Sequence, residues 1–392
     1  MIKSIIRNIL KLLWILPVKK NRVVFRSFQG ASYSCNPKYI SEYITKNRSD
    51  EYEQIWLFKN PKKYTFLRKK GIKVIPQTSL RAVYYLITAG FLIDNLGVQS
   101  YIPLRKKQTV INTWHGGGSY KKIYKEATKE HVDYLQLMMN STTYFISSCA
   151  RFSANNIKYL HDNAPEKILE IGMPRNDIFF GNHDGIERKV KKKLNIPNDT
   201  KLVLYAPTFR DDVDASVYVL DVDRILAALS ERFGGDFVFL LRFHWFTDDH
   251  NPYEDNEHVI DVTSYDDMQE LLYASSVLIT DYSSCIWDAS LSYKPCFIYA
   301  PDLDVYLGYR NFFTPVNEWP FPMARDIDAL CDEIIHFDEE HYKKEVDRHH
   351  TELGSAEHGT ASRTVVALMD KISHKNRNSK DTCGGKKKCI LK

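Results

Sequence analysis

Residues 278–313 read LITDYSSCIWDASLSYKPCFIYAPDLDVYLGYRNFF. It begins inside an apolar run that predicts a short buried strand. The sequence TDYSS follows at residues 280–284, and an amphipathic segment then predicts a helix over residues 284–292. Ser and Asp cap helices, and a helix start that follows a strand attracts anions. The stretch therefore predicts either an ordinary capped helix or a phosphate site in which the hydroxyl groups of Ser283 and Ser284 are donors.

The same alternation of strand and helix continues in both directions along the chain. Strands are predicted at residues 23–25, 54–58, 73–75, 91–94 and 109–114, and again at 202–205, 237–242, 259–262, 277–280 and 296–299. Helices are predicted between them, among them residues 37–45, 221–232, 267–274 and 327–336. Repeated units of this kind predict a parallel sheet covered by helices on both faces. The fold class is therefore α/β.

The chain has 392 residues, which is more than one ordinary hydrophobic core accommodates, so we expect two Rossmann-type domains. Glycine-containing breaks at residues 172–174 and 181–183 indicate the boundary. We expect a basic helix at residues 1–20, a first domain at 21–180, a second domain at 185–372 and a basic disordered tail at 373–392. Ligands of such sheets bind beyond the carboxyl ends of the strands. A cleft between the two domains is therefore the expected site.

Composition and charge narrow the class of protein. Hydrophobic residues make up 44% of the chain and aromatic residues 13%, which indicates a well-packed globular protein. The net charge is +5, but the basic residues gather at the two ends of the chain. This distribution favours an anionic surface or substrate and argues against a nucleic-acid partner. Seven Cys residues without paired spacing argue against a disulfide framework and a structural zinc site, and indicate a cytoplasmic protein.

Residues 2–16 read IKSIIRNILKLLWIL and predict a basic amphipathic helix. Isoleucine and leucine side chains share one face, whereas Lys3, Arg7 and Lys11 share the other. A helix of this kind lies on an anionic membrane surface, and it is too short and too charged to span a bilayer. The alternative is a helix that docks on its own domain. We expect a peripheral protein on the cytoplasmic face of the membrane.

Three further groups of polar residues follow predicted strands. The first is TWHGGG at residues 113–118, in which the glycines permit close backbone approach and His115 is a candidate general base. The second contains Thr208 and Arg210, and Arg offers a fork of donors that matches phosphate oxygens. In the third, Arg242 and His244 alternate along the end of a strand. Each group also has an ordinary structural interpretation, but together they predict a phosphate-handling site.

These motifs resemble one known family. The set WHG, YAPTFRD, RFH and LITDYSS, followed by KPCFIYAPDLD and a Tyr, is similar to the CDP-glycerol glycerophosphotransferases, which include teichoic acid primases, teichoic acid polymerases and capsule-synthesis relatives. The resemblance covers about residues 23–314. It implies a GT-B-like pair of Rossmann-type domains facing a central cleft, and a peripheral attachment to the inner face of the membrane.

The resemblance also implies a reaction and a set of roles. Glycerol phosphate or ribitol phosphate would pass from CDP-glycerol or CDP-ribitol to a hydroxyl of a lipid-linked or polymer acceptor, with release of CMP. His115 would be the catalytic base and His244 a second catalytic residue. Donor phosphates would bind Arg242, Thr208, Arg210, Ser283 and Ser284, with Asp281 in the same turn. The remaining implied residues lie on the acceptor side: Gly116, Gly117, Lys121 and Lys122.

Two further expectations concern the acceptor and the metal. After WHG the family commonly has TPLK, whereas this chain has GGSYK, which is one residue longer and bears on the identity of the acceptor. The chain shows no additional acceptor-handling domain, which favours a primase or a single addition. Asp302 and Asp304 are candidates for Mg²⁺, but the resemblance does not call for a metal. We predict no bound metal and no cofactor.

The sequence is also compatible with two other functions. A GT-B glycosyltransferase that uses a nucleotide sugar would share the fold and a His base, and it would release UDP instead of CMP. A non-enzymatic binding protein would depend on the basic ends of the chain.

Overall fold

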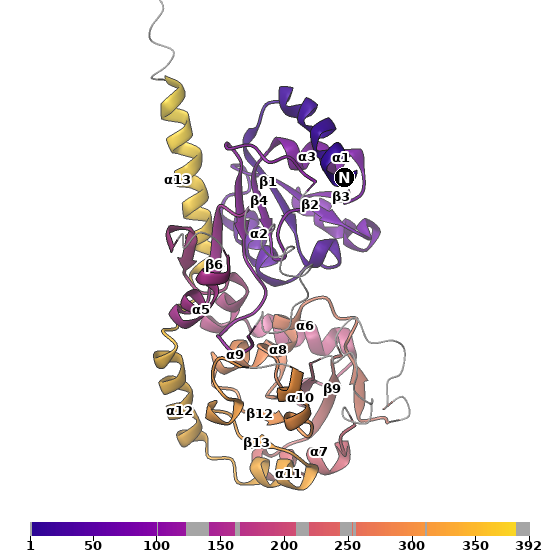
Figure 1. Ribbon diagram of the computed structural model, residues 1–392. Helices are drawn as coiled ribbons and strands as arrows, with labels where there is room; N and C mark the ends of the chain where they lie inside the picture. The colour runs from indigo at the N-terminus through magenta and orange to yellow at the C-terminus, as the bar shows by residue number, and fades with distance from the viewer. Residues whose placement is uncertain are drawn as a thin grey trace, which may run out of the picture.

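The computed structural model describes residues 2–99, 101–122, 141–160, 165–208, 219–243, 253, 256–309 and 312–381. It contains two parallel-sheet α/β domains (Figure 1). Within the described residues all strand pairs are parallel. This confirms the predicted fold class.

The first sheet has seven strands in the order β3-β2-β1-β4-β5-β6-β7. Its strands are β1 (Lys19–Arg26), β2 (Glu53–Phe58), β3 (Lys73–Pro76), β4 (Ala89–Asp94), β5 (Thr109–Asn112), β6 (Tyr144–Ser147) and β7 (Ile168–Glu170). The α-helices described in this part are α1 (Ile2–Leu10), α2 (Cys35–Asn47), α3 (Leu80–Thr88) and α5 (Ala150–Leu160). Short 3₁₀ helices are η1 (Lys11–Ile15), η2 (Phe28–Gly30), η3 (Pro61–Lys70), η4 (Pro165–Lys167) and η5 (Pro174–Phe180).

The second sheet has six strands in the order β10-β9-β8-β11-β12-β13. They are β8 (Lys201–Ala206), β9 (Phe237–Leu241), β10 (Val259–Asp261), β11 (Val277–Thr280), β12 (Cys296–Tyr299) and β13 (Met323–Ala324). The helices are α6 (Asp184–Leu194), α7 (Val222–Phe233), α8 (Met268–Ala274), α9 (Cys285–Ser290), α10 (Leu303–Tyr309), η7 (Val316–Glu318), α11 (Ile327–Ile335) and α12 (Glu339–Glu352).

The first sheet is buried on both faces. Successive side chains of a strand point to opposite faces of the sheet, so each strand supplies apolar side chains to two clusters. Val23 and Phe25 of β1 pack into one apolar cluster, and Val24 between them packs into another. Parallel strands covered on both faces are therefore nearly continuous apolar runs. This pattern is the reason that most strands could be located in the sequence.

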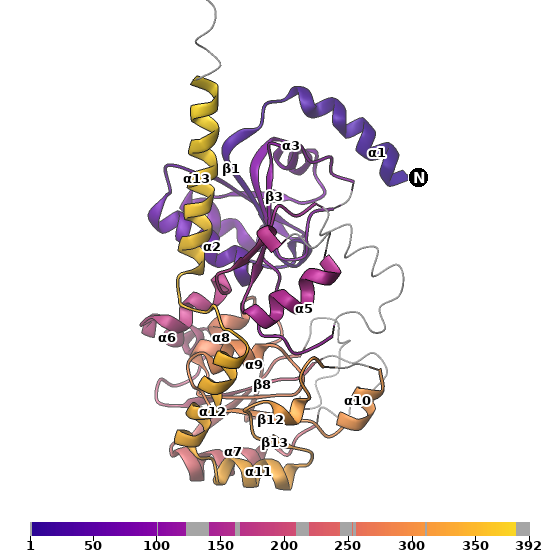
Figure 2. The ribbon, with the colours of Figure 1, turned by 60° about the vertical axis from the view of Figure 1, so that its left-hand side comes forward.

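The last helix, α13 (Ala361–Asp381), returns to the first domain. Figures 1 and 2 show it beside the first sheet, whereas α12 lies against the second. Val365, Val366 and Met369 of α13 belong to the same apolar cluster as Ile40 and Ile44 of α2. The C-terminal helix is thus part of the first domain's core, although the sequence analysis assigned residues up to 372 to the second domain. Residues 373–381, expected in a disordered tail, are helical.

Several element boundaries differ from the expected ones. Strand β5 ends at Asn112 rather than at 114, and α9 covers Cys285–Ser290 rather than 284–292. Strands β6, β7 and β13 were not predicted. The segment expected to form one helix at 2–16 is α1 followed by the 3₁₀ helix η1. Helix α12 was also missed, because only Tyr342, Val346 and His349 of its 14 residues are buried and its apolar stripe is narrow.

Candidate active site

The two sheets share the same order over their first six strands, to which the first sheet adds β7, and each has a switch point where the strand order reverses. In the first sheet this point lies between β1 and β4, and in the second it lies between β8 and β11. Ligands of open parallel sheets bind outside the carboxyl ends of the strands at such a point. Thr208 follows β8 and residues 281–284 follow β11, so Thr208, Asp281, Ser283 and Ser284 of the predicted donor side stand at the second switch point.

His115 lies three residues beyond β5 and is half-buried. Its Nδ1 atom is 3.1 Å from the backbone carbonyl oxygen of Asn95, which follows β4. A carbonyl only accepts hydrogen bonds, so Nδ1 carries the proton and the basic lone pair of the neutral imidazole is on Nε2. The ring packs against Trp114 and edge-on to Phe28. These contacts fix both the tautomer and the orientation of the imidazole.

The backbone before His115 is held in an unfavourable conformation. Trp114 has a φ of 51°, which is the left-handed region. The side chain of Asn36 on α2 donates to the carbonyl oxygens of Thr113 and Trp114, at 2.9 and 3.0 Å. The Trp114 amide donates to Asn112 Oδ1 at 3.0 Å. Bulky residues adopt such a φ only where surrounding contacts over-determine it. The strained turn before His115 is therefore fixed by hydrogen bonds from α2 and from Asn112.

In the second domain, Asp281 organises the predicted donor side. Both of its carboxylate oxygens accept from the Thr208 amide at 2.9 Å, and Oδ1 also accepts from the Tyr282 amide. A carboxylate repels a phosphate group, and these oxygens face amide donors instead. Asp281 therefore joins the ends of β8 and β11.

Ser283 and Ser284 form the turn before α9. The Ser283 hydroxyl accepts from the Cys285 amide at 3.4 Å, whereas Ser284 makes no side-chain cap to the helix. The glycine loop after His115 reaches this turn, because a methyl group at Gly116 would lie 3.5 Å from Ser284 Oγ. Two motifs that are 168 residues apart in sequence (284 minus 116) thus meet across the two domains.

Gly117 packs directly on α9. A methyl group there would lie 2.4 Å from Cδ1 of Trp287 and 2.9 Å from Oδ1 of Asp288. Gly118 has a φ of 63° and lies close to the rings of Tyr120 and Trp287. The glycines are therefore required because a side chain at this position of the loop would separate the two domains.

Lys121, in the loop of the first domain, contacts residues of the second domain. Its Nζ atom donates to Thr208 Oγ1 at 3.4 Å, and its backbone forms an antiparallel bridge with Phe312. The ammonium group also lies over the Tyr306 ring. Lys121 therefore adds a positive charge beside Thr208 and the 281–284 turn. Lys122 is half-buried next to it.

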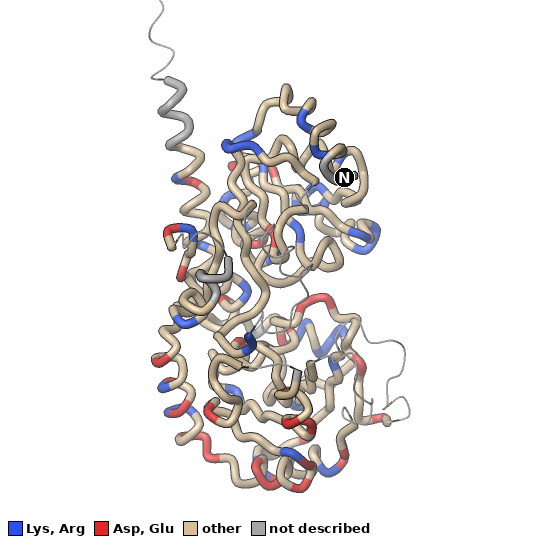
Figure 3. Tube along the Cα trace, viewed as in Figure 1, with Lys and Arg blue, Asp and Glu red and all other residues tan. Residues whose placement is uncertain are grey.

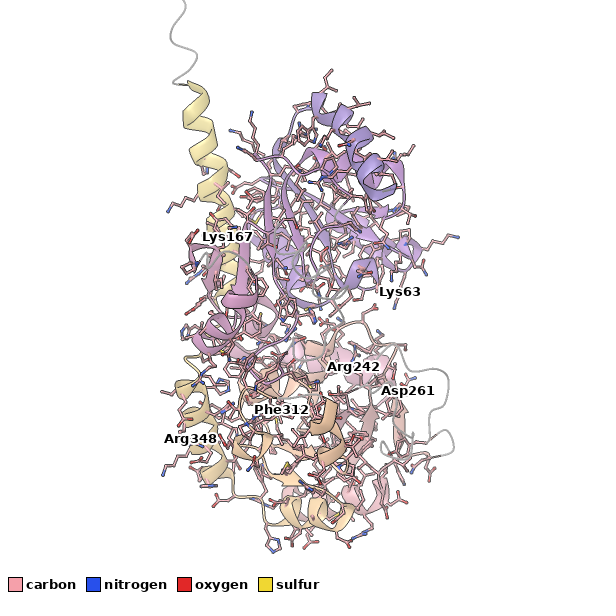
Figure 4. The ribbon with its side chains drawn as sticks, in the orientation of Figure 1. Lys63, Lys167, Arg242, Asp261, Phe312 and Arg348 are labelled. Atoms are coloured by element: carbon pink, nitrogen blue, oxygen red, sulfur yellow. The ribbon has the colours of Figure 1, made fainter. Side chains whose placement is uncertain are left out.

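Arg242 follows β9 and lies in the part of the second domain that is turned toward the first (Figure 4). Its Nη1 donates to the carbonyl oxygens of Val262 and Tyr265, at 3.2 and 2.6 Å. Burial lowers the pKa of the guanidinium from its ordinary value, while the nearby Asp267 and Asp266 oppose this. Part of the guanidinium therefore holds the loop after β10. His244 and Arg210 lie outside the described residues.

A buried polar cluster that was not predicted from the sequence lies beside the His115 loop. It comprises Arg175 and Asn176 of η5, Gln269 of α8, Asp288 of α9, and Glu357. Arg175 pairs with Asp288 at 2.7 Å, and Asn176 donates to both Asp288 and Glu357 at 2.9 Å. The available signal was the polar run PRND at residues 174–177, directly after an apolar strand-like segment, which was interpreted only as a boundary.

The arrangement supports chemistry on an anion. The first domain supplies the His115 imidazole, whose basic nitrogen is defined. The second domain supplies the hydroxyl groups of Thr208, Ser283 and Ser284 and the guanidinium of Arg242, with Lys121 beside Thr208. Among the described residues, no group of three or more His, Cys, Asp and Glu side chains could hold a metal ion. In the same described part, no helix is long and apolar enough to cross a membrane.

Comparisons with known proteins agree with this chemistry. Residues 8–371 match the family described as CDP-Glycerol:Poly(glycerophosphate) glycerophosphotransferase. The chain is 32% identical over 379 residues to the teichoic acid poly(glycerol phosphate) polymerase of Staphylococcus epidermidis, covering 90% of this chain and 51% of that protein. It is 30% identical over 365 residues to the teichoic acid glycerol-phosphate transferase of Staphylococcus aureus, covering 86% and 91%.

A solved structure of a variant of the wall teichoic acid polymerase TagF, soaked with CDPG, matches with a TM-score of 0.79 and 30% identity, covering 95% of this chain and 94% of that one. The chain spans about half the length of the Staphylococcus epidermidis polymerase.

Proposed function

The chain belongs to the CDP-glycerol:poly(glycerophosphate) glycerophosphotransferase family, and from this premise we propose that it transfers glycerol phosphate or ribitol phosphate from a CDP-alditol to an acceptor hydroxyl, with release of CMP. The product would be a teichoic acid or capsular polymer. The observation that carries the proposal is the meeting of the His115 loop with the Ser284 turn across the two domains.

In the proposed reaction His115 is the general base. Its Nε2 takes the proton of the acceptor hydroxyl while the hydroxyl oxygen attacks the phosphorus that bears the alditol. The bond from this phosphorus to the bridging oxygen of CDP breaks, and CMP leaves with that oxygen. Phosphoryl transfers of this kind depend mainly on positioning and on stabilising charge at the phosphate oxygens. The Asn95 carbonyl supports this role because it holds the imidazole in the required tautomer.

The donor side of the proposed site is the second switch point. Thr208, Ser283 and Ser284 would donate hydrogen bonds to the diphosphate, and Lys121 would add a positive charge from the loop of the first domain. Arg242 and Arg210 would stabilise the same oxygens, with His244 at the leaving group. Asp281 acts through the backbone of Thr208.

The acceptor side would be the first domain, with Gly116, Gly117 and Lys122 nearest to the donor. The acceptor is a lipid-linked molecule or the growing polymer. The two domains would be residues 21–180 and 185–372 as a GT-B-like pair around a central cleft, except that α13, from residue 361 onward, packs into the core of the first domain.

We also propose that α1 and η1 rest on an anionic membrane surface at the cytoplasmic face. Trp14 Nε1 and Arg7 donate to the carbonyl oxygens of Pro103 and Ile102, which attach this segment to its own domain. Large apolar side chains nevertheless stay exposed, with Ile9 at 58% and Ile15 at 89%. Apolar area of this kind beside basic residues is typical of interfacial helices.

The test is CMP release by the purified protein from CDP-glycerol and from CDP-ribitol, each with a lipid-linked or short glycerol-phosphate acceptor. Acceptor-dependent CMP from one donor would name the alditol. His115→Ala should lower the rate about 10²- to 10⁴-fold. The absence of CMP with both donors, together with UDP release from a nucleotide sugar, would overturn the proposal in favour of a glycosyltransferase.

A further inference from the structure

Arg175 connects the candidate base to the candidate donor turn. Its side chain is buried, with 5% of the residue exposed. One nitrogen, Nη1, donates to the carbonyl oxygen of His115 at 2.5 Å and lies 3.4 Å from Cys35 Sγ. The other, Nη2, pairs with Asp288 Oδ2 at 2.7 Å. A single guanidinium therefore contacts the backbone of His115 and helix α9.

The backbone of Arg175 is tied to the same loop by a second route. Its amide donates to Asn36 Oδ1 at 3.0 Å. The amide group of Asn36 donates in turn to the carbonyl oxygens of Thr113 and Trp114. Arg175 and the strained turn before His115 consequently share one hydrogen-bonded unit.

Asp288 of α9, the carboxylate partner of Arg175, is held by further hydrogen bonds. It lies four residues after Ser284, which is about one helical turn. Besides Arg175, it accepts from Asn176 at 2.9 Å and from Gln269 Nε2 at 2.8 Å. The carboxylate is buried and directly follows Trp287, the residue against which Gly117 packs.

We propose that Arg175 is a positioning residue that sets, through Asp288, the distance between His115 and the Ser283–Ser284 turn. The inference rests on the proposed function, because it assigns a task within that reaction. A planar guanidinium bridges a carbonyl and a carboxylate at fixed separation, which a flexible ammonium does not. Misplacement of reacting groups by about 1 Å costs on the order of 10²-fold in rate.

This role predicts a specific kinetic pattern. The donor-side groups Thr208, Asp281 and Arg242 all belong to the second domain, whereas Arg175 bonds to the His115 backbone and to Asp288, so donor binding should survive its loss. In Arg175→Met, the kcat for acceptor-dependent CMP release should fall about 100-fold, whereas the KM for the CDP-alditol should change less than about threefold. Arg175→Lys should recover less than a tenth of the lost rate. Arg224→Met, which removes an exposed ion pair with Asp328, is the matched control and should leave both constants unchanged.

Loss of folding is separated from loss of positioning by a double variant. Arg175→Met leaves the buried Asp288 without its cation, which destabilises the fold. Arg175→Met combined with Asp288→Asn removes the unpaired charge, so its thermal stability should recover while its kcat stays low. Recovery of kcat together with Tm, or a rise in donor KM with an unchanged kcat, would overturn the proposal.

A spectroscopic measurement makes the inference independent of turnover. The ring signals of His115 in ¹³C-histidine-labelled protein are assigned by their absence from His115→Ala. They should shift in Arg175→Met and stay in place in Arg224→Met. Unshifted signals would overturn the positioning role even if the wild type released no CMP, whereas absence of CMP from the wild type with shifted signals would count against the proposed function alone.

Discussion

At the scale of single residues, Gly117 marks a close contact between the glycine loop and α9. A methyl group there would come within 2.4 Å of Trp287, whereas one at the neighbouring Gly116 would make contacts of 3.4 Å and longer. Gly117→Ala should therefore lower stability by about 1–3 kcal/mol. Gly116→Ala should change it by less than about 0.5 kcal/mol. Thermal melting of both variants checks the prediction, and equal melting temperatures would contradict the packing of the glycine loop on α9.

Glu357 gives the fold a pH dependence of its own. Burial raises the pKa of this carboxyl to about 8, although the Met173 amide and the side chains of Asn176 and Trp287 donate to it. The folded state therefore binds a proton that the unfolded state releases above its ordinary pKa. The stabilisation is complete below about pH 4.5 and is lost as the pH rises through 8.

The corresponding measurement is the melting temperature of the wild type and of Glu357→Gln between pH 5 and pH 8.5. Between the two pKa values, the wild type should lose stability relative to the variant with a slope approaching about 1.4 kcal/mol per pH unit. Parallel curves for the two proteins would show that Glu357 keeps the same protonation state when the protein unfolds.

At the scale of elements, α2 of the first domain and α8 of the second are joined by a buried ion cluster. Lys38 of α2 contacts Asp267 and, at 2.6 Å, Glu270, and Lys189 also binds Glu270. Burial by itself raises the pKa of Glu270, but the two lysines outweigh it and lower the pKa to about 2. Lys63 pairs with Asp266 nearby, with 48% of its side chain exposed.

Lys38, which is buried, and Lys63, which is exposed, therefore provide a matched pair of variants. Lys38→Met leaves two buried carboxylates with less compensation and should cost about 3–5 kcal/mol. Lys63→Met removes an exposed pair and should cost less than about 1 kcal/mol. Calorimetry should show a large shift for the first variant and almost none for the second; similar small shifts would mean that the α2–α8 contact contributes little to stability.

Most strand positions could be predicted from the sequence, whereas the buried charged contacts between elements could not. Strand β11 was located to the residue because the three apolar side chains of residues 277–279, followed by the turn sequence TDYSS, are typical of a short buried strand that ends at a capped helix. The His115 loop and the Ser284 turn were both predicted to follow strands, and the structure brings Gly116 of this loop close to Ser284. Arg175 was missed because nothing local reveals that its partners lie 60 residues before it and 113 residues after it. A buried charge cluster is a property of tertiary structure, and local pattern cannot predict it.

At the scale of the whole molecule, charge and apolar exposure are unevenly distributed. Lys and Arg are frequent around α1, and Asp and Glu around α11 and the start of α12 at the opposite end (Figure 3). An anionic surface would attract the first end and repel the second. This orientation keeps the second domain directed toward the cytoplasm in the proposed attachment.

Sedimentation with phosphatidylglycerol vesicles tests that orientation. Ile9→Asp combined with Ile15→Asp should weaken binding at least about tenfold, because each buried isoleucine contributes about 1.5–3 kcal/mol. Val305→Asp alters an apolar side chain on α10 that is 61% exposed, and it should leave binding unchanged. Binding should also weaken as salt is added. Equal losses in both proteins would place the membrane contact elsewhere.

The return of α13 to the first domain has a consequence for biosynthesis. Residues 19–170 supply every strand of the first sheet, yet Val365, Val366 and Met369 complete the core on one of its faces. On the ribosome this face stays open while the whole second domain is translated. The second sheet, whose strands lie within one continuous stretch, can close earlier. The core of the first domain is therefore completed only after α13 has been synthesised, although the strands of that domain are synthesised first.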